Sequence, residues 1–157
     1  MTTTPATPTP AHRRALFAAL ADQYGRIPEN TTPRVREALS SAEWVSEVTP
    51  MGVPALLARA AGYDGPFRLA INSSGRRALF TESQWDALLG VSAEGQLPAA
   101  PWPSVQALHR AGVVEYRDMR GRVQAHDGGG RNRAYLTYLG WRAVGQPHDL
   151  ALAHVEN

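Results

Sequence analysis

Arginines gather in one stretch of this sequence. All sixteen basic residues are arginine, and none is lysine. Residues 110–142 contain seven arginines and three acidic residues, so that this stretch carries a local net charge of +4. Residues 1–100 are balanced in charge. Because the planar guanidinium group presents donors in a fixed geometry that matches phosphate oxygens, the stretch could recognise phosphate groups.

The local pattern around these arginines predicts a helix followed by a β-hairpin. A short helix is expected over 104–111, where Val105 and Leu108 share one face and Gly112 ends the helix. Residues 113–118 read as a strand, 127–130 as a turn because three glycines follow Asp127, and 133–137 as the returning strand. Most of the arginines therefore fall on the hairpin.

Two motifs flank this hairpin, Leu108-His109-Arg110-Ala111-Gly112-Val113-Val114 before it and Leu136-Thr137-Tyr138-Leu139-Gly140 after it. They resemble the end of the recognition helix and the Leu-Thr-x-x-Gly motif of MarR-type winged-helix regulators. The resemblance covers residues 104–141, under a quarter of the chain. It implies a winged-helix-like unit that binds double-stranded DNA.

In a unit of that kind, the helix enters the major groove and the hairpin, or wing, lies along the DNA backbone. The resemblance implies base contacts from Gln106, His109 and Arg110 on the predicted helix. For the hairpin it implies contacts with phosphates. The residues expected to make them are Arg117, Arg120, Arg122, Arg131 and Arg133.

Three interpretations of the arginine cluster are open. The first is DNA binding, as a regulator or an accessory factor of a mobile element. The second is a protein-interaction module, a subunit or inhibitor of a nucleic-acid machine that uses the same surface; the overall charge of only +2 favours it. The third is a solvated hairpin whose charge serves solubility. A homodimer is compatible with the first two.

The whole chain is predicted to be an α+β protein of two helix-plus-β-hairpin units that share a core, the second being winged-helix-like. In the first unit, Thr9-Pro10, Thr32-Pro33 and residues 53–61 predict helices. Residues 67–71 and 76–80 predict a hairpin around a turn at 72–75, and Thr81 opens a further helix. The expected division is a disordered Thr/Pro tail (1–10), a first unit (11–91), a linker loop (92–103), a winged-helix-like unit (104–146) and a loose tail (147–157).

A repeat with an offset of 56 residues is also suggested. Residues 77–81 match 133–137, and Trp85 then corresponds to Trp141. Chance similarity between short segments of biased composition is the alternative. A true repeat predicts that both tryptophans are buried, each over its own hairpin.

Catalysis finds no support in the sequence. There is no cysteine, the five histidines show no metal-ligand spacing, and no serine has an evident histidine or acidic partner. We therefore expect that the protein is not an enzyme and that it binds neither a cofactor nor a metal. The absence of a signal peptide and of a long apolar run predicts a cytoplasmic protein with no membrane association.

Overall fold

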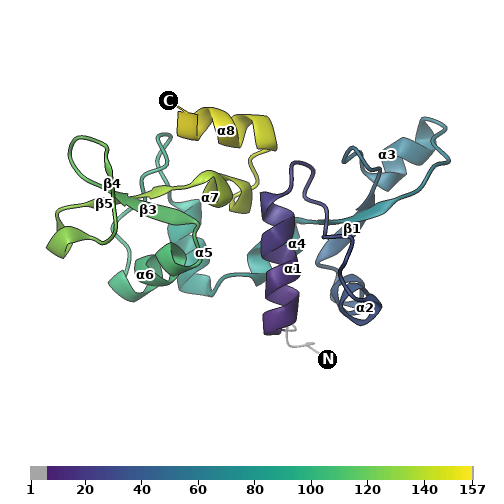
Figure 1. Cartoon of the computed structure of the whole chain (residues 1–157), viewed down its shortest axis with the longest axis horizontal. Helices are drawn as coiled ribbons and strands as arrows, with labels where there is room; N and C mark the ends of the chain where they lie inside the picture. Colours follow the sequence, from purple (N-terminus) through teal and green to yellow (C-terminus); the bar gives the residue numbers. More distant parts are fainter. Residues whose placement is uncertain (1–6, 157) are drawn as a thin grey trace. The chain divides into compact units, whose positions relative to one another are not determined.

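The computed structural model describes residues 7–156. Over these residues the chain forms eight α-helices and two small antiparallel sheets, one of two strands and one of three (Figure 1). The predicted α+β class is confirmed. Most of the predicted Thr/Pro tail, residues 1–6, lies outside the described residues. The chain divides into two compact units, of which unit 1 ends at Leu79 and unit 2 begins at Phe80.

The first two helices of unit 1 begin where the sequence predicts. α1 (Pro10–Ala21) is capped by the Thr9 hydroxyl, which accepts from the backbone N–H of His12. α2 (Pro33–Ser41) is capped in the same way by Thr32. A proline at the first helical position sacrifices no hydrogen bond, because the N–H there has no partner within the helix. The buried side chains of unit 1 include Leu16, Leu20, Leu39 and Leu79.

The predicted strand at 76–80 is wrong. That segment lies largely in a helix, α4 (Ser73–Ala78), because the Asn72 side chain caps it by accepting from the backbone N–H of Gly75. The strand before it is confirmed as β2 (Arg68–Ile71), but its partner is β1 (Val45–Val48), in antiparallel register with Val45 opposite Ile71. Residues 72–75 therefore start a helix and do not form a hairpin turn.

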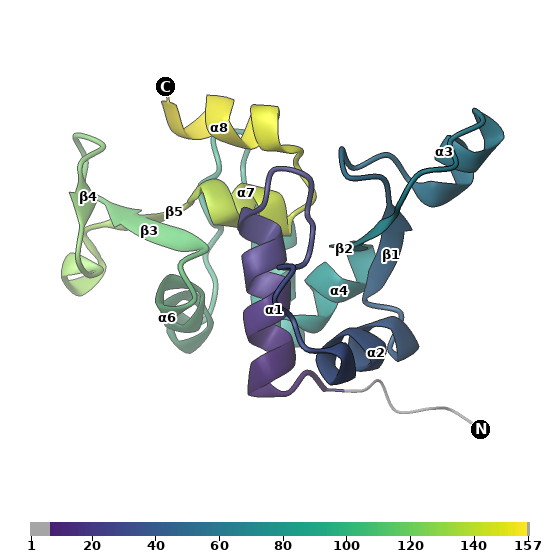
Figure 2. The same cartoon turned by 45° about the vertical axis from the view of Figure 1, so that its right-hand side comes forward.

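The connection between β1 and β2 carries α3 (Ala55–Ala60), which extends beyond the end of the two strands (Figure 2). Of the residues in and next to α3, the small Ala55 and Ala58 are buried, whereas Val53, Leu56 and Leu57 are exposed. With Met51, they are four exposed apolar side chains within residues 51–57, which we call the exposed apolar patch. Leu56 is 81% exposed, which is far from the behaviour of a core residue.

Unit 2 contains the predicted helix-plus-hairpin pattern, with one further helix before it and two after it. Thr81 and Gln84 form the predicted capping box of α5 (Glu82–Leu89). α6 (Trp102–Arg110) leads into a three-stranded sheet with strand order β4-β3-β5. These strands are β3 (Val114–Arg117), β4 (Val123–Gln124) and β5 (Arg133–Leu136), with a single 3-10 turn, η1 (Gly128–Gly130), before β5. Thr137 then caps α7 (Tyr138–Ala143), and α8 (His148–Glu156) ends the described chain.

Residues 92–101 do not form a linker between the units. The backbone N–H of Leu97 donates to the Ala134 carbonyl, and Gln96 forms an isolated bridge with Tyr135, so that this segment lies along β5 as part of unit 2. Unit 2 also contains α5, so the division falls before that helix and outside the segment predicted to be a linker. The pairing of an irregular segment with a strand leaves no periodic signal in the sequence.

The predicted loose tail at 147–157 is wrong for the described residues. Residues 148–156 form α8, and Ala151 is fully buried. The His154 ring stacks on the Trp141 ring with centroids 3.7 Å apart, and the Tyr138 hydroxyl lies 2.9 Å from His148 Nδ1. These contacts hold α8 against α7.

The predicted repeat with an offset of 56 residues is wrong, because Arg77 lies in α4 whereas Arg133 lies in β5. The structure contains a different repeat, in which the backbone hydrogen bonds correspond. In unit 1 the N–H of Asn72 donates to the Trp44 carbonyl; in unit 2 the N–H of Thr137 donates to the Val113 carbonyl. Three further backbone hydrogen bonds of unit 1 have counterparts in unit 2. In unit 1 they join Ile71 to Gly25, Ile27 to Leu69, and Trp44 to Leu39. In the same order, their counterparts join Leu136 to Gly95, Leu97 to Ala134, and Val113 to Leu108.

Each unit thus has the same order of elements. A helix comes first (α1 or α5), then a bridging residue (Arg26 or Gln96) that pairs with the last strand. A second helix (α2 or α6) leads into the strand pair β1–β2 or β3–β5, and a short helix follows (α4 or α7). The connections between the paired strands, residues 49–67 in unit 1 and 118–132 in unit 2, differ in sequence and character. We call residues 118–132 the wing.

Candidate nucleic-acid interface

Residues of the wing of unit 2 line most of an open groove of about 1070 Å³. We call it the arginine groove. Four guanidinium groups line it together with small and polar residues. The arginines are Arg120, Arg122, Arg131 and Arg133. Four of the eight residues predicted to contact nucleic acid are therefore brought together in one cavity.

Asp118 organises the first half of the wing. Its Oδ1 accepts from the backbone N–H groups of Arg120 and Arg122, and its Oδ2 accepts from Nε of Arg122 and from the side-chain amide of Gln124, all at 2.9–3.2 Å. The hydrogen bond from the Arg122 N–H is the largest influence on this carboxyl group and holds its pKa below the ordinary value. The carboxylate is thus used to fold the turn from which Arg120 and Arg122 project.

The second half of the wing is built on three glycines. Gly128, Gly129 and Gly130 all have positive φ, a region that residues with a Cβ rarely adopt. Asp127 Oδ1 accepts from the N–H of Gly129, and the Asn132 side chain donates to the His126 carbonyl. Because this turn carries no side chains, nothing on it blocks approach to Arg131 and Arg133.

The charge of the arginine groove is largely unneutralised. Arg122 forms an ion pair with Asp118 at 3.2 Å, but its side chain remains 66% exposed. Arg133 Nη1 donates to the Gly130 carbonyl at 3.3 Å. Over residues 7–156, no acidic side chain forms an ion pair with Arg120, Arg131 or Arg133. Such a groove is suited to an anion with several oxygen atoms, such as a phosphate chain.

Arg117 does not lie in this groove. It forms an ion pair with Glu115 two residues before it on β3, with Nη2 2.6 Å from Oε1. Its guanidinium group also lies 5.0 Å from the centre of the Tyr135 ring. These contacts hold the side chain, which is only 24% exposed, on the sheet.

The three predicted base-contacting residues lie on α6 but not in the arginine groove. The His109 ring packs against the Tyr116 ring, with centroids 4.8 Å apart, and Gln106 is half-buried. Arg110, the last residue of α6, is exposed. Of the three, Arg110 is therefore the most accessible to a partner.

A second groove, of about 410 Å³, adjoins the arginine groove. We call it the aromatic groove, because the rings of Trp102 and Tyr116 line it with Val105 and the Gln96 side chain. Gly130, Asn132 and Arg133 line both grooves, so the two share part of their lining. Trp102 is 56% exposed, unlike the buried Trp44 and Trp141. Its position between two prolines at a helix start was the signal available to find it.

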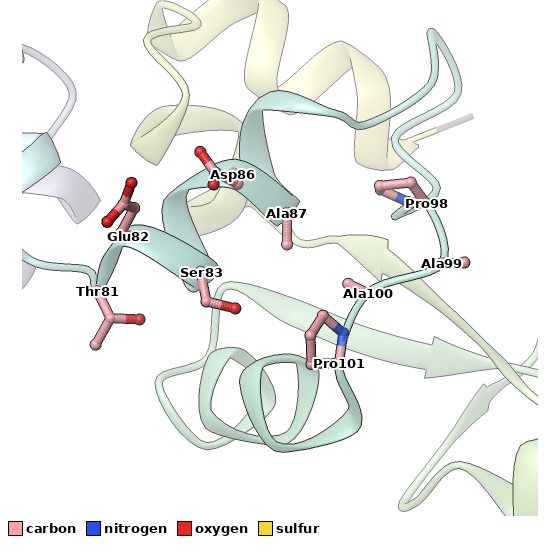
Figure 3. Close-up of a pocket in the computed structure, with 9 residues that line it drawn as sticks. All are labelled: Thr81, Glu82, Ser83, Asp86, Ala87, Pro98, Ala99, Ala100 and Pro101. Carbon is pink, nitrogen blue, oxygen red and sulfur yellow. The ribbon is translucent and has the colours of Figure 1, made fainter.

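A third hollow, of about 610 Å³, lies between α5 and residues 98–101, where Ser83 and Ala87 face Ala100 and Pro101 (Figure 3). Its lining contains Glu82 and Asp86 and no arginine. Two carboxylates without a cation make it unsuited to phosphate. The arginine groove is therefore better suited to phosphate than this hollow is.

Within residues 7–156, no group of three histidine, aspartate or glutamate side chains is arranged to hold a metal ion. Among the same residues, no helix is long and apolar enough to span a bilayer. Comparisons of this chain with protein-family models, with curated proteins and with solved structures found no significant match. Its function is therefore inferred from its own residues.

Proposed function

We propose that unit 2 is a winged-helix-like module that binds nucleic acid, with its wing on the phosphate backbone. The observation that carries this proposal is the convergence of Arg120, Arg122, Arg131 and Arg133 on one groove beside a glycine turn. The only carboxylate in the groove lining, that of Asp118, is already engaged by four hydrogen bonds. Phosphates are the common ligand for arginines arranged in this way.

The order of elements in unit 2 supports the winged-helix part of the proposal. A helix, a short bridge to the last strand, a second helix and a strand pair with an extended connection follow one another from α5 to β5. We propose double-stranded DNA as the ligand, with α6 toward the bases and Arg110 as its most accessible contact. The role would be that of a regulator or an accessory factor of a mobile element, and it consists of binding without catalysis.

A fluorescence-anisotropy titration of a labelled duplex at several salt concentrations tests the proposal. If three or four arginines contact phosphates, the logarithm of affinity should fall with the logarithm of salt with a slope of about −3 to −4. Arg131→Ala with Arg133→Ala should weaken binding and make the slope shallower by about 2. Arg14→Ala with Arg34→Ala is the matched control, since it removes the same charge from exposed positions of unit 1.

An equal loss of affinity in the control pair would mean that overall charge, and not the groove, attracts the DNA. No binding at low salt would overturn the proposal.

A protein-interaction module is the second candidate, and the exposed apolar patch of unit 1 favours it. Met51, Val53, Leu56 and Leu57 are between 43% and 81% exposed. Clustered apolar side chains at a surface are typical of protein contact sites. A second copy of the chain is the simplest such partner. Light scattering of the protein and of its Leu56→Ser, Leu57→Ser variant tests this candidate, because a dimer through the patch would become a monomer in the variant.

A further inference from the structure

The aromatic groove has features that phosphate binding leaves unused. Trp102 presents an exposed indole ring at the start of α6, and its Nε1–H donates to Asp127 Oδ2 at 3.2 Å. The other oxygen of Asp127 accepts from the backbone N–H of Gly129. The carboxylate thus fixes the indole ring against the same glycine turn that borders the arginine groove.

The chemistry of this groove matches a flat, partly polar ring. The Trp102 ring offers a stacking surface, and the side-chain amides of Gln96 and Asn132 offer both donors and acceptors at the groove wall. Gln96 is held by the Tyr135 hydroxyl, which lies 3.3 Å from its Oε1, and Asn132 by its bond to the His126 carbonyl. The volume of about 410 Å³ lies within the range of roughly 300–1,000 Å³ that is usual for small-molecule sites.

The shared lining of the two grooves indicates what this ring belongs to. Gly130, Asn132 and Arg133 line both of them, so a phosphate bound at Arg133 would lie next to the aromatic groove. In a nucleic-acid strand, each phosphate is joined through its sugar to a base. In an intact duplex, however, the bases are stacked and paired inside the helix and cannot enter a side pocket without flipping.

We infer that the aromatic groove holds one unpaired nucleobase, stacked on Trp102, of the strand whose phosphates lie in the arginine groove. The inference rests on the proposed function and specifies its ligand as nucleic acid with a single-stranded end, gap or flipped base. Stacking on an aromatic side chain tolerates any base. We therefore expect the aromatic groove to distinguish an unpaired base from a paired one more strongly than it distinguishes one type of base from another.

The experiment compares a blunt duplex, the same duplex with a single-stranded overhang, and the overhang made abasic, which keeps its phosphates. For the unaltered protein, the overhang should raise affinity over the blunt duplex on the order of 10- to 100-fold, and the abasic overhang should lose most of that gain. Trp102→Ala should remove the gain of the overhang over the blunt duplex, whereas Trp102→Phe should keep most of that gain. The abasic comparison needs no protein variant, so it decides the matter even if Trp102→Ala does not fold.

Equal affinity for the normal and abasic overhangs would overturn the inference. If Arg131→Ala with Arg133→Ala then still weakened blunt-duplex binding, the proposed function would stand without the base site. Absence of binding to all three ligands would overturn both.

Discussion

The carbonyl oxygen of Val113 occupies the space that a side chain on Gly140 would need. In unit 1 the carbonyl oxygen of Trp44 occupies the same space beside Gly75. Each glycine lies in the short helix after the last strand, and the missing Cβ lets that helix approach the start of the first strand. The close approach is therefore a property of both units.

Replacement of either glycine by alanine is expected to destabilise its unit. In an ordinary helix, alanine is favoured over glycine by about 1 kcal/mol. Here the added methyl group would meet backbone, and overpacking of this kind costs about 1–3 kcal/mol. Urea melts of Gly75→Ala and Gly140→Ala measure the difference, with Ser74→Ala at an exposed position of α4 as the control. A stabilising effect at either glycine would contradict the packing described.

Trp141 and Trp85 are expected to differ in their contribution to stability. Trp141 is 6% exposed and stacks on His154, whereas Trp85 is half-buried beside Phe80. Trp141→Ala should cost about 3–5 kcal/mol, as is usual for a buried aromatic side chain, and Trp85→Ala should cost less. Denaturant unfolding followed by circular dichroism gives both values. Equal losses would mean that Trp85 is packed as fully as Trp141.

If α6 reads the sequence of a DNA duplex, Arg110→Ala or Gln106→Ala should reduce the difference in affinity between preferred and random duplexes. A bidentate contact with a base is worth roughly 1–3 kcal/mol of discrimination. Arg131→Ala with Arg133→Ala should instead weaken both duplexes alike, because phosphates carry no base information. Selection from a random duplex pool, followed by anisotropy, measures both effects. If the α6 variants behave like the wing variants, α6 is not the element that reads sequence.

Acid should loosen the first half of the wing. The pKa of Asp118 is lowered in the folded protein, first by the hydrogen bond from the Arg122 N–H. The stabilisation that it provides is present above the ordinary aspartate pKa of about 3.9 and is lost as pH falls through the lower value of the folded state. A proton–nitrogen NMR titration should show the amide signals of Arg120 and Arg122 moving together below pH 4 or so. In Asp118→Asn, this movement should be absent.

The sequence predicted the features that depend on neighbouring residues. Thr9, Thr32 and Thr81 cap their helices as expected, because a cap needs only an oxygen and the N–H three residues ahead. The local sequence at 76–80 predicts a strand, but most of it is helical, because Asn72 caps the helix and Gly75 permits its close approach to the Trp44 carbonyl. Strand β1 was missed because its partner β2 lies at least twenty residues further along the chain.

Part of the candidate site could likewise be predicted from the sequence, and part depends on the fold. The arginines of the wing could be listed from the sequence, and four of them do line one groove. Two other contacts depend on the direction in which each side chain leaves its strand or helix. Glu115 holds Arg117 on the sheet, and His109 packs on Tyr116. The aromatic groove could not be foreseen, because it forms only when residues 96–105 come to lie beside the end of the wing.

The corresponding hydrogen bonds of the two units have a consequence for how this protein can change. They fix the helices and the paired strands, but they leave the connection between the strands unconstrained. The connection in unit 1 carries exposed apolar side chains, whereas the connection in unit 2 carries several arginines. The same frame thus accommodates connecting segments that differ in sequence and charge, as residues 49–67 and 118–132 do.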